Sequence, residues 1–411
     1  DERGDVWDFA KMEADPHLEG QYPIADSIKT LAEYLQSAGY RTGLVGKWGL
    51  GAPYSEGSPN KQGFDFFFGY NCQRQAHTYY PKHLWRNNEK VSLDNNLVVP
   101  GTKLDPGADP KDPSSYARFT QKIYAPALMM EEARQFINQN SRQPFFLFFA
   151  STLPHLALQA PETYVNRYVK KFGNEKPYTG NEGYFPARYP HATYAAMVSY
   201  LDDQVGEIIR LLKANGQYDN TLIIFSSDNG YAYNAGCDPA WFSPFAPFKT
   251  VYGRGKGFVF EGGIRVPMIV SWPGVIHPGT ETPLISAFYD ILPTLCEIAG
   301  IQLPNDTDGI SFLPTLTGNG RQKLHEYLYW DFPEYNGQQA VRMGPWKGIR
   351  LNMQKGNTTI QLFNLDNDLM ESHDVASQYP GMVNQILSIM NREHRKSTFS
   401  QFYLKSIDHD K

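Results

Sequence analysis

The chain of 411 residues is predicted to have an α/β fold, in which helices cover both faces of one large, mainly parallel sheet. A smaller C-terminal α+β subdomain with an antiparallel sheet is expected to follow. Three observations lead to this prediction. Runs of Leu, Ile, Val and Phe alternate with helical patterns over most of the length. Past residue 320 the pattern changes to short alternating segments typical of antiparallel strands. The composition, 41% hydrophobic and 20% charged, suits a globular chain with a core.

The first helix of the α/β part is predicted over residues 27–38, where apolar residues recur on one face and Gly39 provides a C-terminal stop. Residues 42–45 then read as a short buried strand. The same reasoning predicts helices and strands further along the chain: helix 125–138, strand 145–150, helix 194–214, strands 221–226 and 266–271, and helix 285–299.

The change of pattern divides the chain into an α/β domain over residues 1–320 and a C-terminal subdomain over residues 321–411. Within the subdomain the alternation predicts three strands and a last helix: strands 326–330, 340–343 and 361–364, and a helix over about 382–392.

Charge and composition argue against several classes of protein. The net charge of −5 comes from 38 Lys and Arg against 43 Asp and Glu, whereas nucleic-acid-binding proteins normally have a basic surplus. The longest apolar run, residues 145–150, is far shorter than the ~20 residues of a membrane span. Three widely spaced cysteines give neither a disulfide framework nor a zinc site. The chain opens at Asp1 without Met, so we expect a mature, trimmed or truncated polypeptide.

Chemically capable residues lie next to the predicted strands, where open α/β sheets bind ligands. Lys47 stands among glycines after strand 42–45, and His155 follows strand 145–150. Asp228 and Asn229 follow strand 221–226, and Lys256 precedes strand 266–271. Each residue alone is typical of a turn or of a structural position. Together, two ammonium groups, an imidazole and two hard oxygen ligands predict a site for an anion beside Ca²⁺ or Mg²⁺.

These segments resemble a known family. They are similar to motifs of the type I sulfatases, the formylglycine-dependent enzymes of the alkaline phosphatase superfamily. The similar segments occur in the same order: GYRTGLVGKWGLG (39–51), PFFL (144–147) through Pro154-His155, SDNG (227–230), EGGIRVP (261–267), SWPG (271–274) and DILPT (290–294). Segments 340–347 and 362–365 are similar to the small C-terminal subdomain of that family. The resemblance covers nearly the whole chain.

The resemblance implies an alkaline phosphatase-like fold and hydrolysis of a sulfate monoester to an alcohol and sulfate. It implies that Asp228 and Asn229 are ligands of a Ca²⁺ ion. Lys47 and Lys256 would hold the sulfuryl oxygens and neutralise charge in the transition state. His155 would contact the bridging oxygen as a candidate general acid for the leaving alcohol.

One departure concerns the nucleophile. The family uses a Cys or Ser in C/S-x-P/A-x-R, oxidised to formylglycine, and a pair of Asp ligands on the first strand, and neither motif is present. Cys237 stands in a similar context, but Trp241 occupies the Arg position, so we interpret it as a loop residue. We therefore expect that this chain lacks the N-terminal strand and nucleophile segment, through truncation, cleavage or disorder. A sheet without that strand would have an exposed edge, and the chain by itself would be inactive.

The second departure is Gly49, which stands where the family has a His two residues after the signature Lys. Two explanations remain open for His77, which either replaces that imidazole or shapes a substrate loop. Arg74 and Asp238 are further candidates for substrate binding.

A sulfated carbohydrate is the expected substrate, because flat aromatic rings stack on sugar faces and Tyr79-Tyr80, Trp85 and Trp241-Phe242 form aromatic clusters, although most aromatic residues pack in cores. Specificity would lie in the long connections 51–126, 157–191 and 231–254.

Two alternatives to a sulfatase remain. The first is a phosphodiesterase or phosphomutase of the same superfamily, and the second is a non-catalytic protein that binds sulfated glycans. The resemblance favours an exported, periplasmic or secreted protein, and the sequence indicates no oligomeric state.

Overall fold

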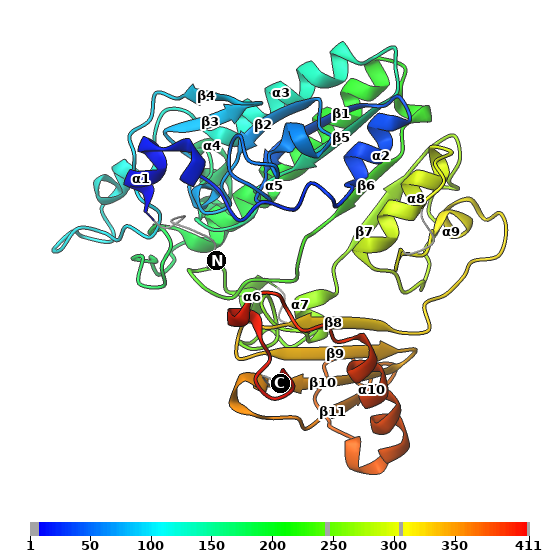
Figure 1. Cartoon of the computed structure of the whole chain (residues 1–411). Helices are drawn as coiled ribbons and strands as arrows, with labels where there is room; N and C mark the ends of the chain where they lie inside the picture. The colour runs from blue at the N-terminus through cyan, green and yellow to red at the C-terminus, as the bar shows by residue number, and fades with distance from the viewer. Residues whose placement is uncertain (1–7, 243–246, 304–306, 409–411) are drawn as a thin grey trace.

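The computed structural model describes residues 8–242, 247–303 and 307–408. Its largest sheet has the strand order β4-β3-β2-β1-β5 (Figure 1). Strand β1 pairs in parallel with β2 and β5, while β3 and β4 extend the sheet as an antiparallel hairpin. The predicted fold class is confirmed. The strand bounds are β1 Arg41–Lys47, β2 Phe66–Tyr70, β3 His83–Arg86, β4 Glu89–Ser92 and β5 Phe145–Ala150.

Helices cover both faces of this sheet because successive side chains of β1 point to opposite faces. On one face Val45 packs against Met129 and Ala133 of α3, and on the other Leu44 lies in a cluster with Ala32 of α2. Beside α3 lies α5, which packs against α4. The bounds are α1 Phe9–Ala14, α2 Leu31–Ser37, α3 Ala125–Gln139, α4 Glu162–Phe172 and α5 Pro190–Ala214.

Local chemistry determines where α2 begins. The Thr30 hydroxyl accepts a hydrogen bond from the Glu33 amide at 3.3 Å, and the Glu33 carboxylate accepts one from the Thr30 amide at 2.6 Å. This capping box starts the helix at Leu31, later than the predicted residue 27, because residue 30 is an N-cap rather than part of the helix. Gly39, with φ +85°, follows the helix end as predicted.

Strands β6 (Ile223–Ser226) and β7 (Met268–Ser271) differ from the expected arrangement. They pair antiparallel with each other as a separate two-stranded sheet, although both were expected in the large sheet. In the described residues β5 pairs with β1 alone, and no described strand lies between β5 and β6. Phe148 on β5 is 50% exposed and Ile269 on β7 is 63% exposed. The separation therefore leaves apolar strands with open edges.

The C-terminal sheet is antiparallel, in the order β11-β10-β9-β8, and lies below the main sheet in Figure 1. One of its faces packs on α10 through Val341 and Ile386, and the other packs on the segment around Phe260 through Ile349. The predicted antiparallel strands are confirmed, whereas the division after residue 320 stays a prediction. The bounds are β8 Leu328–Phe332, β9 Gln338–Met343, β10 Trp346–Leu351, β11 Gln361–Asn364 and α10 Pro380–Glu393.

Four short helices occur in the sequence between β6 and β8. They are α6 (Pro239–Phe242), α7 (Glu261–Ile264), α8 (Ile291–Ile298) and α9 (Leu313–Thr317). The helix predicted over 285–299 is shorter than expected, because a 3₁₀ turn over Phe288–Asp290 precedes α8. Within the described ranges, no helix combines the length and apolar character that a bilayer span requires.

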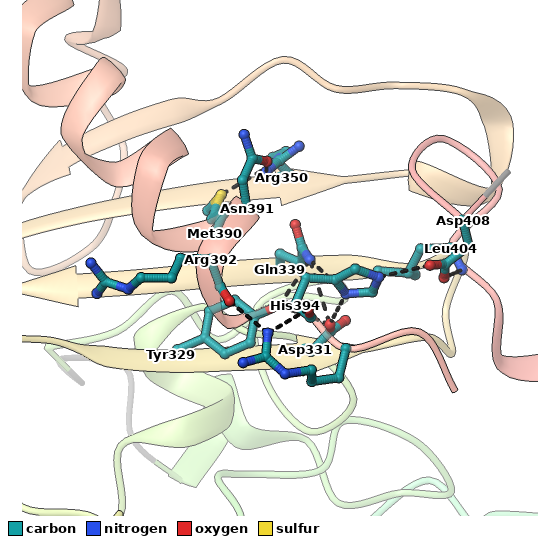
Figure 2. A network of polar contacts seen from close by, with 11 residues as sticks. Tyr329, Asp331, Gln339, Arg350, Met390, Asn391, Arg392, His394, Leu404 and Asp408 are labelled. Carbon is teal, nitrogen blue, oxygen red and sulfur yellow. Dashed lines mark hydrogen bonds and ion pairs between the residues drawn. The ribbon is translucent and has the colours of Figure 1, made fainter. Parts of the chain in front are cut away.

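Two ionic clusters stabilise the C-terminal part, and the first also ties its sheet to α7. The buried Lys347 ammonium lies 2.8 Å from Glu261 of α7 and 2.9 Å from Glu371. The second cluster, drawn in Figure 2, joins Asp331 of β8 to His394 Nδ1 at 2.6 Å and His394 Nε2 to Asp408 at 2.8 Å. It thus connects the end of α10 with the C-terminal tail.

Candidate active site

The site lies at the carboxyl end of β1, whose last residue is Lys47. Gly46 precedes it with φ +131°, and a Cβ there would lie 1.9 Å from the Ala150 carbonyl oxygen of β5. Only glycine allows the two strands to approach this closely. The fold thereby brings Lys47 next to the loop that follows β5.

That loop carries His155 and is held from beneath by a buried tyrosine. The Tyr79 hydroxyl lies 2.6 Å from the Thr152 carbonyl and 2.8 Å from the His155 carbonyl, both of which accept its hydrogen bond. The His155 ring donates from Nδ1 to the Leu156 carbonyl at 2.5 Å. In the neutral ring the proton is therefore on Nδ1, and Nε2 carries the lone pair.

A second imidazole lies directly against the first. The His77 and His155 rings stack with centroids 5.1 Å apart and planes at 17°, and Tyr184 contacts both rings. Arg74 Nη1 lies 2.9 Å from His77 Nδ1. The structure therefore brings two of the candidate substrate-binding residues, His77 and Arg74, to the predicted catalytic His155.

Charge interactions connect the two lysines to the same place. Burial is the main cause that lowers the pKa of Lys47 and of Lys256 below the ordinary lysine value. Asp228 raises both pKa values, and Lys256 lowers that of Lys47. These three residues from distant parts of the sequence are therefore within electrostatic range of one another.

The imidazoles experience the same positive field. Burial, followed by the charges of Lys256 and Lys47, lowers the pKa of His155 to about 4. Burial, followed by His155 and Arg74, lowers the pKa of His77 to about 2. Both rings are neutral at pH 7 in the free chain. A partly buried site with two ammonium groups, a guanidinium and no protonated imidazole is suited to an anion.

The predicted metal ligands fit a part of a Ca²⁺ site. Asn229 Nδ2 donates to the Gly230 carbonyl at 3.2 Å, so the amide oxygen is not used in this hydrogen bond, and Asp228 precedes Asn229 in the sequence. Such hard oxygens suit Ca²⁺, which takes 6–8 oxygen ligands. Within residues 8–242, 247–303 and 307–408, no group of three or more His, Cys, Asp or Glu residues could hold a metal. Two residues alone do not complete the shell, so further ligands are needed.

Asp238 lies apart from this arrangement. Its carboxylate is 3.5 Å from His191 Nε2 and accepts a hydrogen bond from the Trp241 amide at 3.2 Å. No described contact joins it to the His77–His155 pair, so its role in substrate binding stays a prediction. Burial raises the pKa of the nearby Cys237 thiol to about 12, the opposite of an activated nucleophile, which supports its interpretation as a loop residue.

Sequence reasoning did not find every residue of the site. Tyr184, which contacts both imidazoles, lies within the connection 157–191 that was expected to carry specificity, but no motif singled it out. Gly49 has φ +156°, and Gln21 and Gln73 are its nearest side chains. Of the predicted sugar-stacking residues, Tyr79, Tyr80 and Trp85 are buried in the core and unavailable to a sugar, whereas Trp241 is 43% exposed.

Comparison with known proteins agrees with this geometry. A sulfatase family model matches residues 11–301, and a model for the C-terminal part of N-sulphoglucosamine sulphohydrolase matches residues 253–397. Bovine (Bos taurus) arylsulfatase A is 31% identical over 81% of this chain and 60% of its own length. Human (Homo sapiens) N-acetylgalactosamine-6-sulfatase is 31% identical over 81% of this chain and 57% of its own length.

Solved structures give the same result. The crystal structure of Ps i-CgsB matches with a TM-score of 0.70 and 25% identity, over 92% of this chain and 78% of that one. The chain thus spans somewhat less than two thirds of the two named curated relatives and more of the solved structure. With a family model matching most of its length and a matching fold, the chain belongs to the sulfatase family of the alkaline phosphatase superfamily.

Proposed function

We propose that this chain is the larger part of a sulfatase that hydrolyses a sulfate monoester on a carbohydrate. The observation that carries the proposal is the meeting of Lys47, Lys256 and His155 in one partly buried cationic site. A carbohydrate is favoured because a related enzyme is named for N-acetylgalactosamine 6-sulfate and a related structure is a complex with neocarrahexaose. Export from the cytosol is part of the same proposal.

The chain's own residues would act on the two ends of the breaking S–O bond. Lys47 and Lys256 would bind the sulfuryl oxygens and stabilise negative charge that develops in the transition state. His155 Nε2 would hold the bridging oxygen and, once protonated, give its proton to the leaving alcohol. The sulfate anion itself promotes this protonation, because a nearby negative charge raises the pKa of an imidazole.

A Ca²⁺ ion and a formylglycine nucleophile would complete the site. Asp228 and Asn229 would contribute two of the metal ligands, and the formylglycine would supply the oxygen nucleophile that this chain's own residues lack. We infer that a segment N-terminal to residue 1 supplies the nucleophile and a strand between β5 and β6. The open edges of these strands and the exposed Phe148 and Phe225 support this inference.

His77 would replace the family imidazole that is missing at Gly49. The stacked contact with His155 supports this role, since it puts the ring inside the site rather than on a peripheral loop. Because Arg74 lies beside His77 Nδ1, that nitrogen would act as acceptor and Nε2 would carry the proton.

The test is sulfate release from N-acetylgalactosamine 6-sulfate and other sulfated sugars by the chain alone and by a version that includes the encoded upstream segment. We expect turnover only in the extended version, and loss of at least about 100-fold for Lys256→Ala. Turnover by residues 1–411 alone, or faster turnover of phosphate diesters than of sulfate esters, would contradict the proposal. His77→Ala in the extended version tests the replacement role, which is excluded if turnover stays within a few-fold of the parent.

A further inference from the structure

A row of aromatic rings lies around Lys256, the lysine proposed to hold sulfate. The Tyr233 hydroxyl donates to the Lys256 carbonyl at 3.0 Å. From Tyr233 the ring contacts continue to Tyr252 at 5.0 Å, from Tyr252 to Phe258 at 5.6 Å, and from Phe258 to Tyr335 at 5.2 Å. Tyr252 is 71% exposed and Tyr335 is 46% exposed, so each presents a ring to solvent. Large exposed aromatic rings beside a polar site are typical of a ligand-binding surface.

Tyr335 comes from the C-terminal sheet, in the turn between β8 and β9. Its ring lies against Gly257, where a Cβ would stand only 2.7 Å from the ring. The turn is fixed there by the fully buried Gln338, which donates to the Gly257 carbonyl at 2.8 Å and accepts from the Val259 amide at 3.2 Å. Two hydrogen bonds of Gln338 therefore join the segment after Lys256 to the end of the turn that carries Tyr335.

The backbone of this turn is unusual. Tyr335, Asn336 and Gly337 have φ values of +51°, +70° and +75°, so three consecutive residues are left-handed. A bulky side chain rarely adopts this conformation, and such strain collects at ligand sites when the surroundings hold it in place. The Tyr335 ring is stacked on Phe332 at 6.1 Å and lies against Gly257, but 46% of the residue is still exposed. Its position indicates a use at the surface.

Tyr335 also acts electrostatically on a tyrosine that contacts the imidazoles. It helps to raise the pKa of Tyr184, whose main cause is burial, and Tyr184 contacts both His77 and His155. It acts in the same direction on the pKa of Tyr233. The Tyr335 hydroxyl is therefore within electrostatic range of tyrosines that border the site, one beside the imidazoles and one beside Lys256.

We propose that Tyr335 and Tyr252 bind the sugar ring whose sulfate group is held at Lys256, so that the turn between β8 and β9 helps to select the substrate. The inference rests on the proposed function and adds the location of the leaving-group sugar. A pyranose ring has apolar C–H faces that pack on flat aromatic rings, and its hydroxyls remain free for the tyrosine hydroxyls. Inorganic sulfate has no such face and would not use these rings.

The test is calorimetric titration of the full chain, in Ca²⁺ buffer, with inorganic sulfate, glucosamine 6-sulfate, N-acetylgalactosamine 6-sulfate and galactose 4-sulfate. We expect at least one sugar to bind more tightly than sulfate. Tyr335→Ala should lower the affinity for that sugar about tenfold and change the affinity for sulfate by less than about twofold. Tyr335→Phe, which keeps the ring and removes only the hydroxyl, should lose less affinity for the sugar than Tyr335→Ala. Tyr379→Ala is the matched control, since Tyr379, the residue before α10, is 45% exposed and contacts Trp346 instead.

Several results would overturn the inference. It fails if Tyr335→Ala binds the sugar as tightly as the parent, or if no sugar binds better than sulfate. Should Tyr335→Ala not fold, Tyr252→Ala replaces it, because Tyr252 lies outside the left-handed turn, and the same tenfold loss is required. If the parent does not bind sulfate at all, the proposed function and this inference both fail. If the parent binds sulfate but the results above fail, only this inference is overturned.

Discussion

At the scale of single residues, His155 shows how the neighbours of a side chain determine its chemistry. Its pKa is lowered to about 4 by burial and by two lysines, so in the free chain it is neutral and cannot act as an acid at pH 7. An anion between those lysines offsets their charge. The sulfate group of the substrate would therefore raise the pKa of the imidazole that is proposed to protonate the leaving alcohol.

We predict that saturating sulfate raises the pKa of His155, because the bound anion favours the imidazolium over the neutral ring. Histidine NMR titrations with and without sulfate, at equal ionic strength with chloride as control, measure the shift. Lys256→Ala should raise the same pKa without any ligand, since it removes the largest lowering charge. A titration midpoint that sulfate leaves unchanged would contradict the assignment of this pocket to the anion.

The strand-end argument explains why Lys47 and His155 are neighbours, because they follow the parallel strands β1 and β5. It does not explain Lys256, which precedes β7 in a separate antiparallel sheet. The sequence was not sufficient for the stacking of His77 on His155, which joins two irregular loops whose paths no periodicity describes. It also could not separate Tyr79, whose ring is buried beneath the His155 loop, from exposed Tyr335. Burial of an aromatic residue in a loop depends on tertiary packing.

At the scale of elements, the end of α10 is attached to the C-terminal tail by one imidazole between two carboxylates (Figure 2). Burial lowers the pKa of His394, but hydrogen bonds to Asp408 and Asp331 outweigh burial and raise it above its ordinary value of 6.5. A raised pKa means that the folded chain binds this proton more tightly than the unfolded chain. The attachment therefore contributes its full stabilisation of the folded chain below pH 6.5. This stabilisation is lost as the pH rises through the pKa of His394 in the folded chain.

We accordingly predict that the stability of the C-terminal sheet and its tail decreases as the pH rises above 6.5. Limited proteolysis of the tail and urea unfolding, each measured at several pH values, would detect the change. His394→Gln should remove the pH dependence in that window. The matched control is His373→Gln, since the His373 side chain is 84% exposed on the same subdomain. Equal pH dependence in His394→Gln and the parent would contradict the prediction.

At the scale of the whole molecule, Lys347 of β10 joins the C-terminal sheet to the EGGIRVP segment that bears α7. Burial raises the pKa of Glu261, but Lys347 and neighbouring arginines hold it below the ordinary value, whereas burial keeps that of Glu371 raised. One buried ammonium thus forms ion pairs with two carboxylates, and the pKa of Glu261 is lowered whereas that of Glu371 is raised.

Lys347→Met should destabilise the folded chain by about 3–5 kcal/mol, because it removes the ammonium that pairs with buried Glu371 and leaves Glu261 with only the more distant Arg265 and Arg342. Urea unfolding measures the loss, and Lys355→Met, at an exposed position of the same subdomain, should stay within about 0.5 kcal/mol of the parent. A loss below about 1 kcal/mol for Lys347→Met would mean that the two carboxylates find other partners or protons.

The open edges of β5 and β6 give the last prediction, which concerns the assembly of the main sheet. If an upstream segment supplies a strand between them, its backbone pairs with amides that otherwise face solvent. In hydrogen exchange, peptides covering 145–150 and 223–226 should be more protected in the extended chain than in residues 1–411. The strand β10 is the internal control, because both of its edges are already paired and its exchange should not change. Equal protection of β5 and β6 in the two chains would show that the added segment folds elsewhere, and the nucleophile would then need another route to Lys47 and Lys256.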